Sequence, residues 1–508
     1  MAPRRGHDSR PRSAGLNQAD GDRVKKSITT RPKRPGRPFK IPRGHSSRSR
    51  SQSSRSSISA SPRVATPVRQ RTLSILETLP VEVIEKIFLY SLNLDLPRAS
   101  SVLAAALSRD QTYSLLIILA LWNDPLGTIP LNAAMASMLA PLEYTPLTRG
   151  HRKSLQEEVF RCKWCTMERV REQIPKIMTL NLHRLWVDTG VTMEPDQRVA
   201  FDRFIKRKDA SRLLLEGSGG ILEQIMDQTP RRFSPSQNPK EYKLCVEPNV
   251  KIQILSRTTG ATTVWPAIEL LEFPIHLLRG GITGFSAEDV AFLEMLRLCS
   301  NNFYQEDGVC KLSTATTVNR MYLHHGVRNA IRCRNLEALV SLLKIDEFTY
   351  RAKQVEADRN AFYTIPSDHF VTTTIVCRND PSLSLTFFAA LIRASAESIP
   401  VDSLEVTEWI VENVQLAEEN PTRYKETNGR FAHWLSNFIL WLPAHLGSVP
   451  GHPKNQLFFC GQLNVSEPEA FRYFEEVLEP WNESISNYMT ESSFHPEQFW
   501  IKHDKELS

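Results

Sequence analysis

The sequence lacks a long apolar segment, a zinc-type cysteine array and any complete catalytic motif. Its longest apolar run, Leu115 to Trp122, has eight residues, whereas a membrane-spanning helix needs about 20. We therefore expect no membrane partner. The charged N-terminus also argues against a secretory signal, so a nuclear or cytoplasmic location is predicted.

Eight cysteines are present, all between Cys162 and Cys460. Such scattered cysteines in a large chain are typical of reduced thiols rather than of a disulfide framework. Cys162 and Cys165 form a Cys-x-x-Cys pair, but no second pair or spaced histidine pair completes the four ligands of zinc. We interpret them as ordinary cysteines of a helix expected over residues 155–174, interrupted at Pro175.

Known catalytic and phosphate-binding motifs are also missing. The glycine-rich stretch 217–220 lacks the Lys-Ser/Thr of a phosphate loop, and we interpret it as a turn between helices. The adjacent His324 and His325 would point about 100° apart on a helix. We therefore expect no catalytic residues, no cofactor and no metal, and we predict that the protein is not an enzyme.

The charge of the 508 residues is unevenly distributed. Residues 1–72 contain 19 Lys and Arg against 3 Asp, a net charge of +16, whereas the remainder contains 44 Lys and Arg against 53 Asp and Glu. Apolar residues are too few in 1–72 to offset the entropy of folding. We predict a disordered basic tail over residues 1–72.

One segment of this tail resembles an AT-hook, the minor-groove binding motif built on Gly-Arg-Pro. Its basic residues Lys33, Arg34, Arg37 and Lys40 are candidates for nuclear import or nucleic-acid contact, since basic runs attract phosphates without sequence preference. Alternatively, the tail is a solvated linker with incidental import character.

Two further features of the tail concern phosphorylation. Ser46 to Ser61 contains ten serines with interspersed arginines and resembles a short Arg-Ser tract. Ser61 and Thr66 each precede a proline and are candidate phosphorylation sites. Phosphate groups there would add about −1.5 to −2 charges each and weaken attraction to nucleic acid.

A helical module is predicted over residues 73–125. Pro80 suits a first helical turn, and Ile84, Ile87 and Phe88 follow at helical spacing. Further helices are expected at 98–107 and 111–122. The third is apolar on nearly all sides and must be covered by other parts of the chain or by a partner.

The pattern Leu79-Pro80-x-Glu82-Val83-Ile84-x-x-Ile87-Phe88 resembles the F-box-like domain of a large group of filamentous-fungal proteins. The resemblance implies a dock for the Skp-type adaptor of an SCF (cullin–RING) ubiquitin ligase. The residues implied in adaptor binding are Leu79, Pro80, Val83, Ile84, Ile87 and Phe88. The alternative is a helical cap that recruits no partner.

A helical region with a β-hairpin is predicted over residues 126–275. Alternating side chains at 250–254 and again at 262–265, separated by the turn 258–260, indicate the hairpin. An extended loop would give the same pattern.

Helix pairs follow from residue 276. Apolar periodicity predicts helices at 287–298, 327–334, 336–343 and 383–393. The region 276–415 resembles degenerate ankyrin repeats, which implies an irregular α-solenoid. An aromatic-rich helical region is expected over 416–508, with Trp434, Phe438 and Trp441 at helical spacing.

The predicted fold is thus mainly α, with a basic tail, an F-box-like three-helix module and an irregular solenoid carrying a hairpin insertion. The predicted function is that of a substrate-receptor subunit of an SCF-type ubiquitin ligase, with an unknown protein target bound by the helical body. The alternative is a nuclear interaction scaffold with a nucleic-acid-attracting tail and no ligase role.

Overall fold

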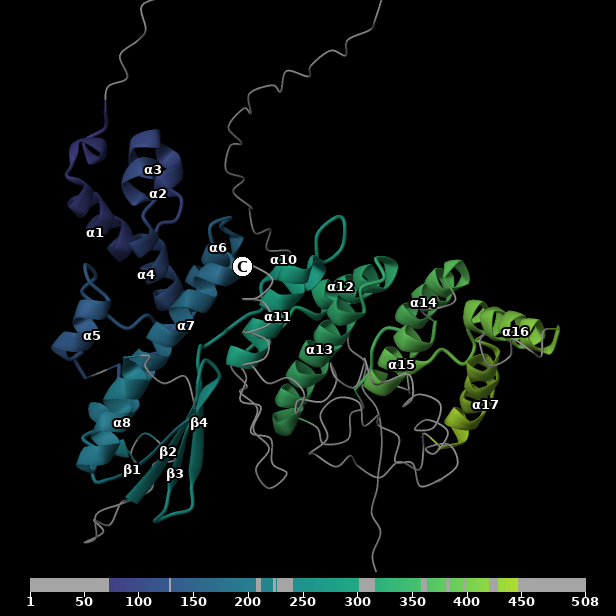
Figure 1. The fold of residues 1–508 in the computed structure, drawn as a ribbon. Coiled ribbons are helices and arrows are strands. Elements are labelled where there is room, and N and C mark those ends of the chain that lie inside the picture. Colours follow the sequence, from purple (N-terminus) through teal and green to yellow (C-terminus); the bar gives the residue numbers. More distant parts are fainter. Residues whose placement is uncertain are drawn as a thin grey trace, which may run out of the picture. The chain divides into compact units, whose positions relative to one another are not determined.

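The computed structural model describes most of the chain between residues 73 and 445. The described ranges are 73–127, 129–206, 212–222, 225, 241–300, 316–357, 363–380, 384–395, 398–419 and 428–445. These residues are mainly helical and include one small antiparallel sheet (Figure 1). The mainly α prediction is therefore confirmed.

The described residues begin with a short 3-10 turn followed by four helices. These are η1 (Leu76–Thr78), α1 (Val81–Ser91), α2 (Leu96–Ala99), α3 (Ser101–Leu107) and α4 (Asp110–Leu121). Helix α1 starts directly after Pro80 and ends at Ser91, and the next residue, Leu92, has a left-handed φ of 49°. The helix expected at 98–107 is divided because the Ser100 hydroxyl caps a new helix by accepting the Leu103 N–H.

In the next helices, the break lies at a different position from the one predicted at Pro175. They are α5 (Ala133–Met138), α6 (Arg149–Arg161), α7 (Met167–Leu182), the π-helix η2 (His183–Val187) and α8 (Pro195–Ile205). The single helix predicted over 155–174 is instead two helices, because Thr166 caps a new helix at residue 167. Pro175 lies inside α7 and does not interrupt it.

The sheet has four strands where the sequence predicted one hairpin. Strands β1 (Leu213–Ser218), β2 (Glu241–Glu247), β3 (Lys251–Ser256) and β4 (Thr262–Pro266) pair in sequence order, all antiparallel. The predicted hairpin is the β3–β4 pair. Strand β1 was wrongly interpreted as leading into a turn between helices, because its partner β2 lies more than twenty residues away in the sequence.

The remaining helices are arranged largely in pairs. They are α10 (Ile275–Arg279), α11 (Ala287–Ser300), α12 (Arg320–Arg332), α13 (Leu336–Ala357), α14 (Asp368–Asn379), α15 (Ser384–Ser395), α16 (Leu404–Glu419) and α17 (Gly429–His445). The predicted junction between α12 and α13 is confirmed. Arg334 makes the turn there with a φ of 58°.

Contacts between these helices follow a regular order. Helix α12 contacts α10 before it and α14 after it, and α14 contacts α16. In the same way, α13 contacts α11 and α15. The helices from α10 to α16 therefore pack against their counterparts in the neighbouring pairs, and apolar residues from all pairs belong to one core.

Candidate protein-docking surface

Helix α1 has apolar side chains on two different sides. On the inner side, Ile84 and Phe88 are 1% and 2% exposed, and α1 contacts α3 and α4. Glu85 is also buried, where it accepts a hydrogen bond of 2.8 Å from the Thr112 hydroxyl of α4. Burial of a carboxylate requires such a partner, so this bond fixes α1 on α4.

The outer side of α1 is apolar and uncovered in the described structure. Val83, Ile87 and Tyr90 are 41%, 38% and 53% exposed and are spaced four and three residues apart, so they share one side of the helix. Pro80 at the helix start is exposed and Leu79 is partly buried. We call Leu79, Pro80, Val83, Ile87 and Tyr90 the α1 face.

The six residues that the sequence suggested for adaptor binding thus separate into two sets. Leu79, Pro80, Val83 and Ile87 lie on the α1 face, whereas Ile84 and Phe88 lie in the core. Tyr90 was missed, although its position seven residues after Val83 was a signal for it.

Helix α4 fastens this module to the rest of the chain. The Glu269 backbone N–H donates to the Leu121 carbonyl oxygen over 2.8 Å, and the Trp122 indole N–H donates to Asn181 Oδ1 over 2.9 Å. Gln156 of α6 donates to the carbonyl oxygens of Ala120 and Glu269, each over 2.7 Å. The expected cover of α4 is therefore supplied by the chain itself, with α1, α6 and α7 in contact with it.

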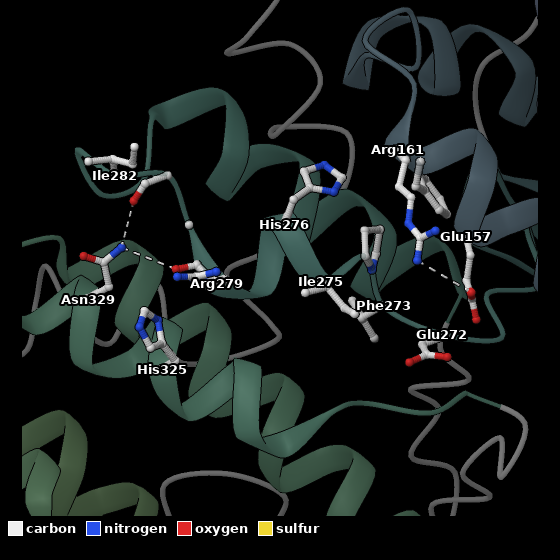
Figure 2. A pocket seen from close by; sticks show the side chains of 14 residues that line it. Glu157, Arg161, Glu272, Phe273, Ile275, His276, Arg279, Ile282, His325 and Asn329 are labelled. Atoms are coloured by element: carbon white, nitrogen blue, oxygen red, sulfur yellow. Dashed lines mark hydrogen bonds and ion pairs between the residues drawn. The ribbon is translucent and has the colours of Figure 1, made fainter. Parts of the chain in front are cut away.

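A separate cavity of about 900 Å³ lies among α6, α10, the loop 280–282 and α12 (Figure 2). The buried side chains of Phe160 and Phe273 belong to its lining, with Ile275 and Ile282 more exposed. Arg279, His325 and Asn329 lie toward one end, whereas Arg161, Glu157 and Glu272 lie toward the other, with His276 between them (Figure 2). No sequence motif indicated this cavity, because its lining comes from separate elements.

The two acidic residues of the cavity have basic partners. Glu272 pairs with Lys153 at 2.7 Å, and Glu157 pairs with Arg161 at 3.9 Å. Arg279 is exposed and has no ion pair in the described part of the chain. Removal of water from around the His276 ring lowers its pKa, so this imidazole is neutral at pH 7. The end of the cavity near Arg279 therefore carries an unbalanced positive charge.

A buried polar network joins α12, α13 and α14 elsewhere in the body. Asp346 is fully buried and accepts hydrogen bonds from Arg320 over 2.7 and 2.8 Å and from the Tyr363 hydroxyl over 2.7 Å. His324 Nδ1 lies 3.2 Å from His369 Nε2, and His324 Nε2 lies 3.5 Å from Asp346 Oδ2.

Burial, followed by the nearby His324 and Arg328, lowers the pKa of His369 to about 3. Burial also lowers the pKa of His324, although Asp346 opposes that shift. Both imidazoles are therefore neutral at pH 7. The predicted divergence of the two adjacent histidines is confirmed, since His324 belongs to this network and His325 lines the cavity.

The other candidate sites have structural explanations. Cys162 and Cys165 lie in the turn between α6 and α7 rather than on a helix, and Cys165 is buried. Within the described ranges, no cluster of three or more His, Cys, Asp or Glu side chains could hold a metal.

The glycine stretch is likewise explained by close packing. A Cβ on Gly217 would lie 2.5 Å from Val191, and one on Gly220 would lie 2.3 Å from the Thr189 carbonyl oxygen. Gly217 belongs to β1, and Gly220 has a φ of +76°. These glycines allow β1 and the following turn to approach residues 189–191 closely.

Several predicted sites lie outside the described residues. These are the suggested nucleic-acid or import residues Lys33, Arg34, Arg37 and Lys40 and the phosphorylation sites Ser61 and Thr66. A nucleic-acid partner and the alternative scaffold role remain predictions. Of the aromatic C-terminal region, Phe431 and Phe438 of α17 are described and buried.

Comparison with protein-family models, with curated proteins and with solved structures gave no match. Of the helices described, none is by itself long and apolar enough to cross a membrane. Helices α3 and α4 would reach that length only together, across a bend of 74°.

Proposed function

We propose that this protein is a substrate-receptor subunit of an SCF-type ubiquitin ligase. The α1 face docks the Skp-type adaptor, and the helical body binds the protein to be ubiquitinated. In this role the chain brings two proteins together and catalyses no reaction itself.

The observation that carries the proposal is the uncovered apolar side of α1. A helix that serves only as a cap needs one apolar side, directed toward the core. Helix α1 already has that side in Ile84 and Phe88, yet it also keeps Val83, Ile87 and Tyr90 at the surface. Clustered exposed apolar side chains mark interaction surfaces, which favours docking over the cap.

Attachment of the module to the body supports the same role. The module is held by the hydrogen bonds of Leu121 and Trp122 and by the apolar packing of α4 on α6 and α7. A partner bound at the α1 face is thereby connected to the body through packed helices. A ligase receptor needs such a connection to hold its target near the ligase.

The helix pairs support a binding role for the body. Their neighbour-to-neighbour contacts from α10 to α17 are those expected of a solenoid, in which each unit packs mainly on adjacent units. Stacked helix pairs of this kind offer extended surfaces for proteins. We therefore assign target binding to the region that begins at α10.

Co-purification of the full chain with the Skp-type adaptor tests this proposal. Val83→Glu combined with Ile87→Glu should reduce adaptor recovery at least tenfold, because two carboxylates would be placed in an apolar interface. Leu79→Ala with Pro80→Ala should weaken it less. Helical content measured by circular dichroism should stay unchanged in the glutamate double variant, since Val83 and Ile87 are exposed.

A matched control comes from α16. Leu404 and Val411 are 68% and 47% exposed, so Leu404→Glu with Val411→Glu makes the same chemical change elsewhere and should leave adaptor recovery unchanged. Adaptor recovery that is absent for the wild-type chain, or equal for both double variants, would refute the docking role.

A further inference from the structure

The cavity beside α10 combines features that favour a peptide rather than a compact ligand. Its apolar lining includes Phe160 and Phe273, and its exposed apolar residues are Ile275 and Ile282. Arg279 adds a cation without an acidic partner in the part of the chain described. A ligand that fits both the apolar lining and Arg279 must carry apolar side chains next to an anionic one.

The loop that holds Ile282 is built around glycines with positive φ. Gly280 and Gly284 have φ values of +71° and +101°, which glycine adopts without strain. Gly281 and Gly284 exchange backbone hydrogen bonds of 2.8 and 3.2 Å. A Cβ on Gly280 would lie 2.8 Å from the Phe285 ring, so the loop is closely packed at its base.

Asn329 of α12 fixes the same loop from the other side. Its Nδ2 donates to the carbonyl oxygens of Arg279 and Gly281 over 3.3 and 3.1 Å (Figure 2). Ile282 nevertheless remains fully exposed, at 105% of its reference area. A constrained loop thus holds the Ile282 side chain in water. This exposure does not stabilise the fold, but it pre-organises the side chain for contact with a partner.

The electrostatics select the kind of peptide. Lys153 and Arg161 balance Glu272 and Glu157 at one end. Arg279 at the other end has no acidic partner among the described residues, and His325 and Asn329 lie toward that same end. A guanidinium binds a carboxylate well through charge-assisted hydrogen bonds. A basic segment would meet repulsion at this end.

We propose that this cavity binds a segment of another protein in which acidic and apolar side chains alternate. The carboxylates lie against Arg279, and the apolar side chains pack on Ile275, Ile282 and the aromatic lining. Identification of this segment with the target of the ligase rests on the function proposed above. Peptide binding itself does not.

Fluorescence anisotropy with a short labelled peptide tests the proposal on the full chain. The probe alternates Asp and Glu with Leu and Phe, and a second probe carries Lys and Arg in place of the acids. The acidic probe should bind, with an affinity that falls as salt is added, and the basic probe should not. Binding of both probes with equal affinity, or of neither, would overturn the proposal.

Two variants locate the binding site. Arg279→Glu should weaken binding of the acidic probe about tenfold or more, since attraction becomes repulsion, and Ile282→Ser should weaken it severalfold. Arg332→Glu is the matched control, because Arg332 is an exposed arginine on α12 with no ion pair in the described ranges and lies outside the cavity lining. Equal losses for Arg279→Glu and Arg332→Glu would show non-specific attraction and reject the site.

Inorganic phosphate serves as a competitor. Displacement of the probe by millimolar phosphate alone would show a small-anion site and reject the peptide. The adaptor experiment is independent of this outcome, because Arg279→Glu leaves the α1 face intact. Adaptor binding without peptide binding would reject only this inference, and peptide binding without adaptor binding would reject only the ligase role.

Discussion

Helix α1 and the α12–α14 region place their side chains in opposite ways. Helix α1 leaves apolar Val83, Ile87 and Tyr90 in water, whereas α12–α14 encloses ionisable Asp346 and His369. Both arrangements are unfavourable by themselves, since apolar exposure and charge burial each cost free energy. The buried groups obtain polar partners within the chain, whereas the apolar side chains of Val83 and Ile87 stay 41% and 38% exposed.

This difference separates structural from functional residues. Asp346 is satisfied by Arg320 and Tyr363, and it is explained by its role in holding α12 and the segment before α14 against α13. On the α1 face, Val83 and Ile87 keep much of their apolar surface in water, which does not stabilise the fold. A second protein that covers the α1 face would bury this apolar surface and gain free energy, as expected of an adaptor dock.

The strongest test of the comparison removes the central acid of the buried network. Asp346→Ala should lower the free energy of unfolding by about 4 kcal/mol, because it removes three hydrogen bonds to a buried carboxylate, two from Arg320 and one from the Tyr363 hydroxyl. Denaturant titration of the full chain measures this change. A loss below about 1 kcal/mol would mean that water replaces the carboxylate, and the network would not be structural.

A matched pair on α1 tests the distinction between its two sides. Ile84→Ala should lower the free energy of unfolding by about 3 kcal/mol, as expected for a buried isoleucine. Ile87→Ala, at 38% exposure, should change it by less than about 1 kcal/mol. The effect on adaptor recovery should be the reverse, with Ile87→Ala reducing it in a folded protein. Equal destabilisation by both variants would remove the basis for an outward face.

The buried His369 should make the fold less stable as the pH falls. The folded-state pKa of His369 is lowered to about 3 from an ordinary 6.5, so between these values the unfolded chain binds a proton that the folded chain does not. Stability from this group is fully present above pH 6.5 and is lost as the pH falls, by about 1.4 kcal/mol per unit. His369→Gln should reduce that slope in urea titrations between pH 7 and pH 5, and an unchanged slope would contradict the assignment.

Local chemistry predicted much of the helical structure. Pro80 and the following apolar spacing placed α1, and Arg334 with Asn335 placed the turn between α12 and α13. Strand β1 and the break at residues 162–166 were missed. Strand β1 depends on pairing with the distant β2, and the break depends on a single capping threonine within a continuing apolar pattern.

The candidate docking surface was predicted in part. Four of the six suggested residues reached the α1 face, and two went to the core. Periodicity alone could not separate them, since Val83 and Ile84 are neighbours of similar hydrophobicity. No sequence pattern indicated the cavity, because Phe160, Arg279 and Asn329 come together only after α6, α10 and α12 have packed.

The sequence by itself determined that the described chain would be mainly helical and that α1 would carry apolar side chains at helical spacing. These properties follow from local propensity and from the spacing of side chains along the chain. Only the tertiary structure decided which side of α1 faces the core, which acid is enclosed and where Arg279 meets an apolar lining. Hydrophobic burial is non-directional, so the partners of a side chain are set by long-range packing rather than by its neighbours in sequence.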